Sequence, residues 1–101
     1  MAYTAEVRFS WDPAKDESNR SKHGLGFDEA SELFRRSIDY LEIFDEAHSV
    51  SEERFIAIGP LVDGVVVVVF TEPDDDTIRI LSARRATPRE VALYQQHMDN
   101  T

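Results

Sequence analysis

The chain has 101 residues, of which 42% are hydrophobic and 31% charged, and its formal net charge is -9 at pH 7. This composition is typical of one globular domain, residues 1–101, that encloses a single core. The sequence has no cysteine, which excludes disulfides and thiolate zinc sites. Its acidity argues against binding nucleic acid through overall charge, so any site for a polyanion has to be local.

The sequence predicts neither export nor membrane insertion. Its first residues, MAYTAEVRFSWDP, contain no basic segment followed by an apolar run, so we expect no signal peptide. The longest apolar run, Val65 to Phe70, is too short to span a membrane. We therefore expect a cytoplasmic protein that does not contact a membrane.

The first half of the chain predicts one strand and two helices. Residues 5–11 alternate between apolar and polar side chains, as in a half-buried strand. Asp12–Pro13 is typical of a helix start, and we expect this helix to end with Lys22–His23, before Gly24. A second helix is predicted over residues 27–36.

The second half of the chain predicts four strands. A short strand near residues 38–44 precedes an acidic loop, residues 45–53, which we expect to be the most mobile segment. Three strands of a meander follow, over residues 54–59, 65–71 and 77–84, and turns at residues 60–64 and 72–76 join them. The middle strand is an unbroken apolar run, as expected for a central strand covered on both faces.

A last helix begins at residues 87–90, TPRE, which form a capping box with proline at the first helical position. Val91, Tyr94 and Met98 then recur at helical spacing. The predicted order is β-α-α-β-β-β-β-α. We therefore expect an α+β fold in which helices pack on one mostly antiparallel sheet of about five strands.

Basic residues cluster near the end of the chain. Four of the 11 lysines and arginines lie within residues 78–90, namely Arg79, Arg84, Arg85 and Arg89. Strict alternation divides the last strand into two faces, one with Arg79, Leu81 and Ala83, and the other with Ile78, Ile80 and Ser82. At the start of the last helix, free backbone N–H groups add positive potential.

Two interpretations of this cluster are open. The four arginines can form a compact pocket for one or two phosphates around the helix start. Alternatively, they pair with nearby acids, namely Glu72, residues 74–76 and Glu90.

No metal or cofactor site is predicted. The three histidines, His23, His48 and His97, lack the spacing of metal ligands, and there is no cysteine to assist them. The sequence contains neither a phosphate-binding loop nor a dinucleotide-binding fingerprint.

Three segments of the chain share their pattern with one known family. They are WDPAKDESNRSKHGLGFDEASELF, EERFIAIG and IRILSARRATPREVALY. The most specific positions are Trp11, Asp12, Lys15, Asn19, Lys22, His23, Gly24, Phe27, Ala30, Phe34, Glu53, Arg54, Gly59, Arg79, Ile80, Ser82, Ala83, Arg84, Ala86, Glu90 and Tyr94. Over about residues 9–95, the sequence resembles the BrnT toxins of bacterial type II toxin–antitoxin systems.

The resemblance implies a RelE-like ribonuclease fold and metal-independent RNA cleavage that inhibits translation and growth. It also implies neutralisation by a BrnA-like antitoxin, expected in a 2:2 heterotetramer. The antitoxin contains the DNA-binding part, so the protein is expected to reach DNA only through this partner.

Metal-free RNA cleavage needs a base for the ribose 2′-OH, cations for the dianionic phosphate and an acid for the leaving oxygen. The predicted catalytic residues are His23, Glu53, Arg54, Arg79 and Arg84. The predicted substrate-binding residues are Lys22, Arg85 and Arg89. Among these, His23 and Glu53 are the candidates for base or acid.

Structural interpretations of the same residues stay open. His23 is also suited to the negative end of its helix dipole, and Glu53 and Arg54 to a cross-strand charge pair. A rival function is a catalytically degenerate binding module that holds an antitoxin and acts as a co-repressor. The two functions differ in whether the arginine cluster is exposed or is neutralised by residues 72–76.

We predict that the isolated chain does not bind duplex DNA at physiological ionic strength, because its charge is -9 and it has no recognition-helix signature. Operator binding should require the antitoxin. A gel-shift assay with the isolated chain measures this, and a retarded band at that ionic strength would contradict the prediction.

Overall fold

The computed structural model describes residues 7–36 and 39–100. Its elements are β1 (Arg8–Ser10), α1 (Pro13–His23), α2 (Phe27–Arg35), β2 (Leu41–Phe44), the 3-10 helix η1 (Glu46–His48), β3 (Arg54–Leu61), β4 (Gly64–Asp74), β5 (Thr77–Arg85) and α3 (Pro88–Asp99). This order confirms the prediction. Residues 5 and 6 of the first predicted strand, and residue 38 of the second, lie outside the described residues. No helix in the described part is long and apolar enough to cross a membrane.

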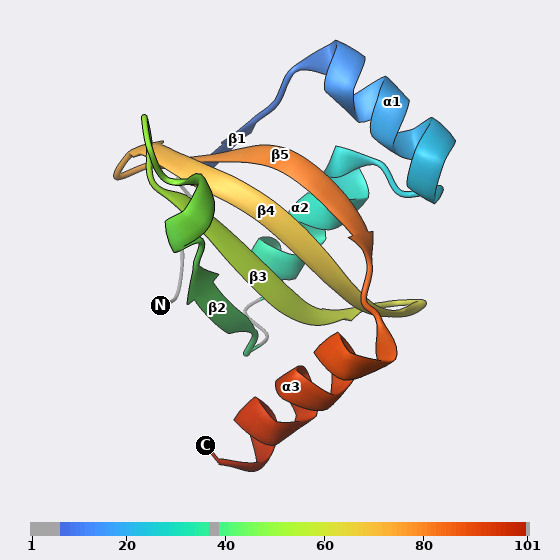
Figure 1. The fold of residues 1–101 in the computed structure, drawn as a ribbon. Helices are drawn as coiled ribbons and strands as arrows, with labels where there is room; N and C mark the ends of the chain where they lie inside the picture. Colours follow the sequence, from blue (N-terminus) through green and yellow to red (C-terminus); the bar gives the residue numbers. More distant parts are fainter. Residues whose placement is uncertain (1–6, 37–38, 101) are drawn as a thin grey trace.

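The five strands form one sheet in the order β1-β5-β4-β3-β2 (Figure 1). All neighbours are antiparallel except β1, which runs parallel to β5 and pairs only with residues 77–79. Two strands end at least two residues later than predicted, since β3 continues to Leu61 and β4 continues to Asp74. The two turns that follow these strands are therefore shorter than the sequence pattern suggested.

Helix α2 packs on one face of the sheet and lies behind it in Figure 1. The main core forms between them. Its most deeply buried side chains include Phe27, Leu33, Val68, Phe70 and Ile80. Burial of these large apolar groups is the main source of stability for the fold.

The opposite face of the sheet presents Arg54, Ile58 and Val67, and we call it the open face. Helix α3 covers one end of it, where Tyr94 packs against Ile58 and Val67, and the loop that contains η1 lies on the same side of the sheet (Figure 1). Val69 of β4 is half-buried on the same face. The predicted covering of the central strand on both faces is therefore confirmed on the α2 side and at one end of the open face.

An irregular pairing between β4 and β5 decides which side chains of β5 share a face. The pairing skips Leu81, because the β4 partners of Ile80 and Ser82 are adjacent residues. This β-bulge shifts the alternation by one residue. Ala83 therefore faces the core, and Ser82 lies on the open face with Arg79. The two faces predicted from strict alternation are wrong beyond Ile80 for this reason.

Helix α1 covers the edge of β5 beyond its pairing with β1, through the side chain of Asn19. This side chain is 6% exposed and takes the place of a strand neighbour. Its Oδ1 accepts from the Ala83 N–H at 3.2 Å, and its Nδ2 donates to the Ala83 carbonyl at 2.7 Å. Nδ2 also donates to the Leu25 carbonyl at 2.8 Å. One amide thus joins α1, the loop that follows it and β5.

We predict that Asn19→Ala lowers the free energy of unfolding by about 2–4 kcal/mol, because buried backbone groups of Leu25 and Ala83 lose their partners. Urea unfolding followed by Trp11 fluorescence measures this. Ser18→Ala, at an exposed position of the same helix, is the matched control and should change the value by less than about 0.5 kcal/mol. An Asn19→Ala variant as stable as the wild type would contradict the structural role of this amide.

Candidate functional site

A row of polar side chains crosses the open face at the end away from α3. Strand register aligns Ser10, Arg79, Thr71 and Arg54 as neighbours on β1, β5, β4 and β3. Arg79 donates from Nη1 to the Ser10 hydroxyl at 3.4 Å. Arg54 and Arg79 are half-buried, and their Cα atoms are about 10 Å apart, two strand spacings. We call these two residues the arginine row, since guanidinium groups so spaced can hold a phosphate from two sides.

Thr71, between the two arginines, is a position that the sequence interpretation missed. It is 1% exposed, and its hydroxyl has no hydrogen-bond partner among the described residues. Buried hydroxyls without partners are uncommon, and a catalytic role or a bound water or ion is among the explanations for them. The sequence shows only a threonine at the end of an apolar run, and its place between Arg54 and Arg79 follows from strand register.

A groove lies between α1 and the edge of β5. Its volume is about 290 Å³, and its lining residues are Lys15, Ser18, Asn19, Lys22, His23, Leu81 and Ser82. Lys22 and His23 form the last turn of α1, as predicted, and the left-handed Gly24 (φ 66°) ends the helix. The structure thus brings both residues beside the middle of β5, between Arg79 and Arg84. We call this the α1–β5 groove.

Arg84 also lies on the open face, but its charge is compensated. Its Nη1 and Nη2 donate to the two carboxylate oxygens of Glu90 at 2.7 and 2.8 Å. Glu90 also accepts from the Thr87 N–H at 2.8 Å, within the predicted capping box of α3. The hydrogen bonds from Arg84, together with those from Thr87, lower the pKa of Glu90 to about 2. The charge-pairing interpretation is therefore confirmed for Arg84, with Glu90 as the acid.

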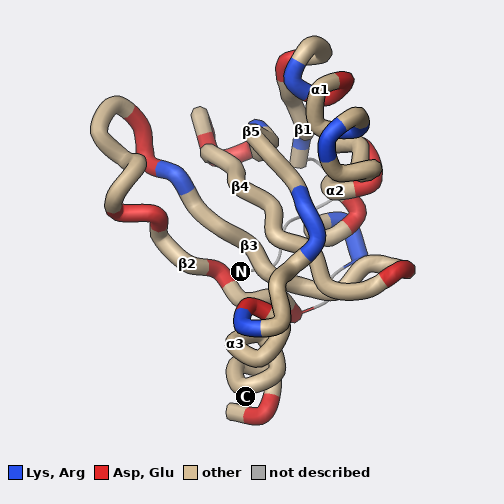
Figure 2. Tube along the Cα trace, turned by 45° about the vertical axis from the view of Figure 1, so that its right-hand side comes forward, with Lys and Arg blue, Asp and Glu red and all other residues tan. Residues whose placement is uncertain are grey.

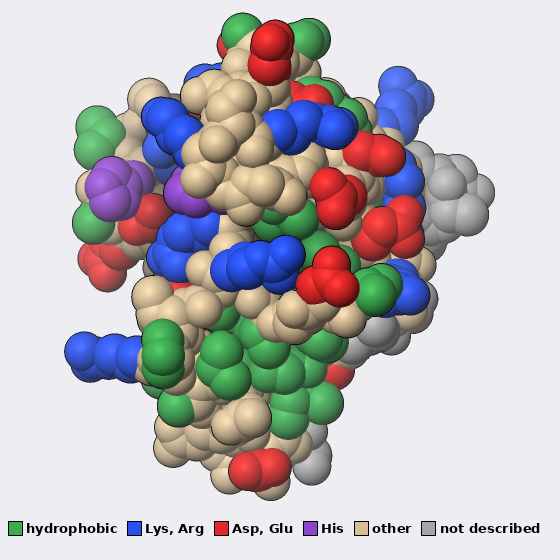
Figure 3. Space-filling view, turned by 90° about the vertical axis from the view of Figure 1, so that its right-hand side faces the viewer, with side chains coloured by type: hydrophobic (Ala, Val, Ile, Leu, Met, Phe, Trp, Pro, Cys, Tyr) green, Lys and Arg blue, Asp and Glu red, His purple; other side chains and the backbone are tan. Residues whose placement is uncertain are grey.

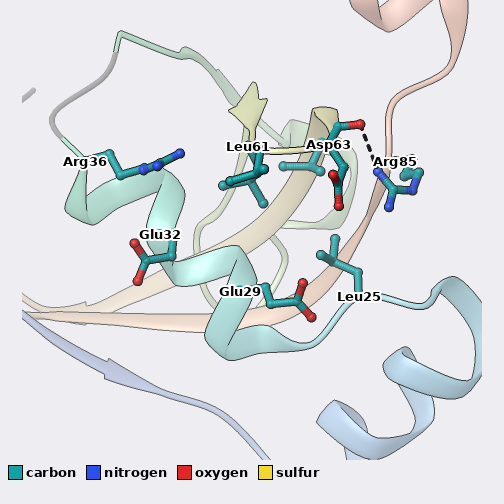
Figure 4. A pocket seen from close by; sticks show the side chains of 9 residues that line it. Leu25, Glu29, Glu32, Arg36, Leu61, Asp63 and Arg85 are labelled. Carbon is teal, nitrogen blue, oxygen red and sulfur yellow. Dashed lines mark hydrogen bonds between the residues drawn. The ribbon is translucent and has the colours of Figure 1, made fainter.

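Arg85, Arg89 and Glu53 lie elsewhere. Arg85 is on the α2 side of the sheet, where its Nη1 donates to the Asp63 carbonyl at 3.3 Å (Figure 4). Arg89 is exposed in the first turn of α3. Glu53 is exposed just before β3, and β4 lies between β3 and β5 in the sheet. The predicted single pocket of four arginines is therefore wrong, because neighbouring strand residues such as Arg84 and Arg85 point to opposite faces.

The pocket beside Arg85 differs in character from the α1–β5 groove. It has a volume of about 170 Å³ and lies between α2 and the turn that joins β3 to β4 (Figure 4). Its lining residues are Leu25, Glu29, Glu32, Arg36, Leu61, Val62, Asp63, Val66 and Arg85. Three carboxylates accompany two guanidinium groups there, so this pocket is poorly suited to a polyanion.

The loop of residues 45–53 lies on the opposite side of the sheet from α2 in Figures 1 and 2. It is attached to β3, because the Arg54 N–H donates to the Ser49 hydroxyl at 2.9 Å and that hydroxyl donates to the Asp45 carbonyl at 2.6 Å. His48 Nδ1 lies 3.0 Å from the Asp45 carboxylate. The mobility of this loop stays a prediction.

Acidic and basic residues are mixed around the site. Figure 2 shows basic positions on α1, on β5 and at the start of α3, with acidic positions near them. On the side seen in Figure 3, lysines and arginines are likewise interspersed with acids. The basic side chains of this acidic protein are therefore distributed in small local groups. Over residues 7–36 and 39–100, no three His, Asp or Glu side chains are grouped so as to hold a metal ion.

Together, the fold and these features define a class: a small α+β protein with cationic side chains on an exposed sheet face and along the adjoining edge. Residues 11–90 match the family model of the ribonuclease toxin BrnT of type II toxin–antitoxin systems. Because this match covers most of the chain, the protein belongs to the BrnT family. The resemblance seen in the sequence is thereby confirmed.

The structure is similar to the 1.1 Å crystal structure of the Brucella abortus ribonuclease toxin, BrnT. The TM-score is 0.60 and the sequence identity is 24%, over 80% of this chain and 97% of that chain. This similarity confirms the predicted α+β fold. None of the curated proteins matches the chain.

We predict that Glu90→Gln destabilises the protein near neutral pH and has little effect in acid. The pKa of Glu90 is about 2 in the folded protein, against an ordinary value of 4.5. Stabilisation by this carboxylate is therefore fully present above about pH 4.5 and is lost as the pH falls toward 2. We expect about 1 kcal/mol at pH 7, because Arg84 is 41% exposed and solvent screens the pair.

Urea unfolding of both proteins at a series of pH values measures this difference. If the wild type and the variant differ by the same free energy of unfolding at every pH, the role given to the charged Glu90 is wrong.

Proposed function

We propose that this protein is a metal-independent endoribonuclease toxin that acts in the cytoplasm, where it cleaves RNA and so inhibits translation and growth. The observation that supports this most directly is the arginine row. Arg54 and Arg79 lie in register on the open face, at the end away from α3. Two preorganised cations in this position can stabilise the dianionic phosphate that develops during cleavage.

In the proposed reaction, the ribose 2′-oxygen attacks the neighbouring phosphorus and the bond from phosphorus to the 5′-oxygen breaks. A cyclic 2′,3′-phosphate forms. A base removes the 2′-OH proton, and an acid supplies a proton to the leaving 5′-oxygen, so no oxidant or metal is required.

His23 is the side chain best placed for one of these proton transfers. It lines the α1–β5 groove beside Ser82. Ser82 belongs to β5, the strand that also contains Arg79. Lys22 lines the same groove, and its ammonium group can bind substrate phosphate. Glu53, the other candidate, precedes Arg54 and so lies on the far side of the arginine row. The two candidates thus flank the proposed phosphate site.

The proposed partner is a BrnA-like antitoxin that covers the arginine row, in a 2:2 heterotetramer that reaches DNA only through the antitoxin. The open face offers apolar contacts beside the arginines. Ile43, Ile56 and Val69 are neighbours across β2, β3 and β4, and Ile43 is 37% exposed. An antitoxin segment with acidic and apolar side chains fits this combination.

One observation supports a second function, a catalytically degenerate binding module that holds an antitoxin and acts as a co-repressor. The Arg84–Glu90 pair removes one of the predicted phosphate-binding cations. Arg79 of the arginine row is not neutralised in this way, since within the described residues no ion pair joins it to residues 74–76. The Asp74 carboxylate instead accepts from the Asp76 N–H. This difference favours the ribonuclease.

We predict that Arg79→Ala reduces RNA cleavage by the isolated chain about 100-fold without changing the melting temperature, because it removes a preorganised cation at the phosphate. His23→Gln should also reduce cleavage, since it removes the titrating group. Arg84→Ala should instead lower the melting temperature, with activity falling only as folded protein is lost. RNA degradation assays combined with circular dichroism measure both effects.

Arg36→Ala, at the end of α2, is the matched control and should leave cleavage unchanged. If the Arg79→Ala and His23→Gln variants stay folded and still degrade RNA and arrest growth, the catalytic assignment is wrong. A wild-type protein that neither degrades RNA nor arrests growth would favour the binding module.

A further inference from the structure

Both lysines of the chain line the α1–β5 groove. The 11 basic residues comprise nine arginines and two lysines, Lys15 and Lys22. A separation of seven residues, about two helical turns, places the two lysines on one face of α1, and Ser18 lies between them. The groove therefore concentrates the ammonium groups of this protein on one helix face.

The opposite wall of the groove is a short open stretch of the β5 edge. β1 pairs with β5 only as far as Arg79, and Asn19 bonds to Ala83. Between these points, Leu81 and Ser82 line the groove. This stretch is too short for strand addition, which needs a longer row of open backbone groups. An extended peptide is therefore a poor occupant.

No carboxylate lines the groove in the part of the chain that the structure describes. Two acids of this segment make other contacts. The Asp12 side chain accepts from the Ala14 N–H at 2.9 Å, and Asp16 accepts from the Phe27 N–H at 2.8 Å and pairs with Arg20. The two ammonium groups are thus not neutralised within the groove, although the whole protein has a net charge of -9.

We propose that the α1–β5 groove binds the phosphate and sugar of one nucleotide of a single-stranded RNA substrate; this rests on the ribonuclease function proposed above. Lys15 and Lys22 bind the phosphate, and the hydroxyls of Ser18 and Ser82 donate to phosphate or sugar oxygens. The volume of about 290 Å³ suits one nucleotide. No phenylalanine, tyrosine or tryptophan lines the groove among the described residues, and the imidazole of His23 is assigned above to proton transfer. We therefore expect the base not to be stacked in the groove and its identity to matter little.

The position of the groove gives the substrate a path. The groove opens on β5 between Arg79 and Arg84, so an RNA chain bound in the groove continues onto the open face. Its next phosphate then reaches the arginine row. Lys15 and Ser82 are therefore substrate-binding residues, in addition to Lys22.

Acylation of lysine tests this proposal directly, because the chain has only two lysines. The isolated protein is treated with an amine-acylating reagent, with and without a short single-stranded 2′-fluoro RNA, which lacks the attacking hydroxyl and is not cleaved. Mass spectrometry then measures modification at Lys15 and Lys22. We expect the RNA to protect both lysines, and oligonucleotides of different sequence to protect them equally.

The double variant Lys15→Gln/Lys22→Gln should bind this RNA about ten-fold more weakly. The slope of log affinity against log salt concentration should fall by about 0.7, the value for one phosphate of a single strand. The matched control is Arg35→Gln/Arg36→Gln at the end of α2, which removes the same charge from a different part of the molecule and should bind like the wild type.

The outcomes separate this inference from the proposed function. If the wild type binds RNA but the lysines are not protected and the double variant binds equally well, the groove assignment is wrong and the ribonuclease proposal stands. If the wild type binds no RNA, the proposed function itself fails. If a poly-glutamate peptide protects both lysines as strongly as RNA does, the groove is a site for acidic protein segments and the inference is overturned.

Discussion

The buried amide of Asn19 is the interaction on which the arrangement of this protein depends. A strand edge inside a fold leaves backbone N–H and carbonyl groups without partners, and β1 is too short to pair with all of β5. Asn19 supplies both a donor and an acceptor to Ala83. It is also the only buried residue of α1, so hydrogen bonds rather than an apolar face hold this helix in place.

This mode of attachment leaves most of α1 exposed beside β5. A helix docked through an apolar stripe would cover the strand edge with aliphatic side chains. Here, Lys15, Lys22 and His23 face Ser82 across a groove. The open face continues from that edge to the arginine row, and α3 covers its other end. The proposed RNA site is thus a consequence of how α1 is held.

Elements whose limits depend on local contacts were predictable from the sequence. Asp12 caps α1, Gly24 ends it, and Thr87 and Glu90 form the capping box of α3. Each of these signals involves residues only a few positions apart. For the same reason Lys22 and His23 were correctly placed in the last turn of α1.

The arrangement of the arginines was not predictable, because it depends on strand register. The bulge at Leu81 moves Ala83 into the core, and alternation then separates Arg84 from Arg85. The approach of Arg54 to Arg79 across Thr71 requires the pairing of three strands.

The most direct measurement of the central claim, that single-stranded RNA binds across β5, is a titration of the isotope-labelled isolated chain with 2′-fluoro RNA, followed by amide chemical shifts. The account predicts that the largest shifts fall on residues 79–84 and on the last turn of α1, whereas largest shifts on α2, or none, would contradict it.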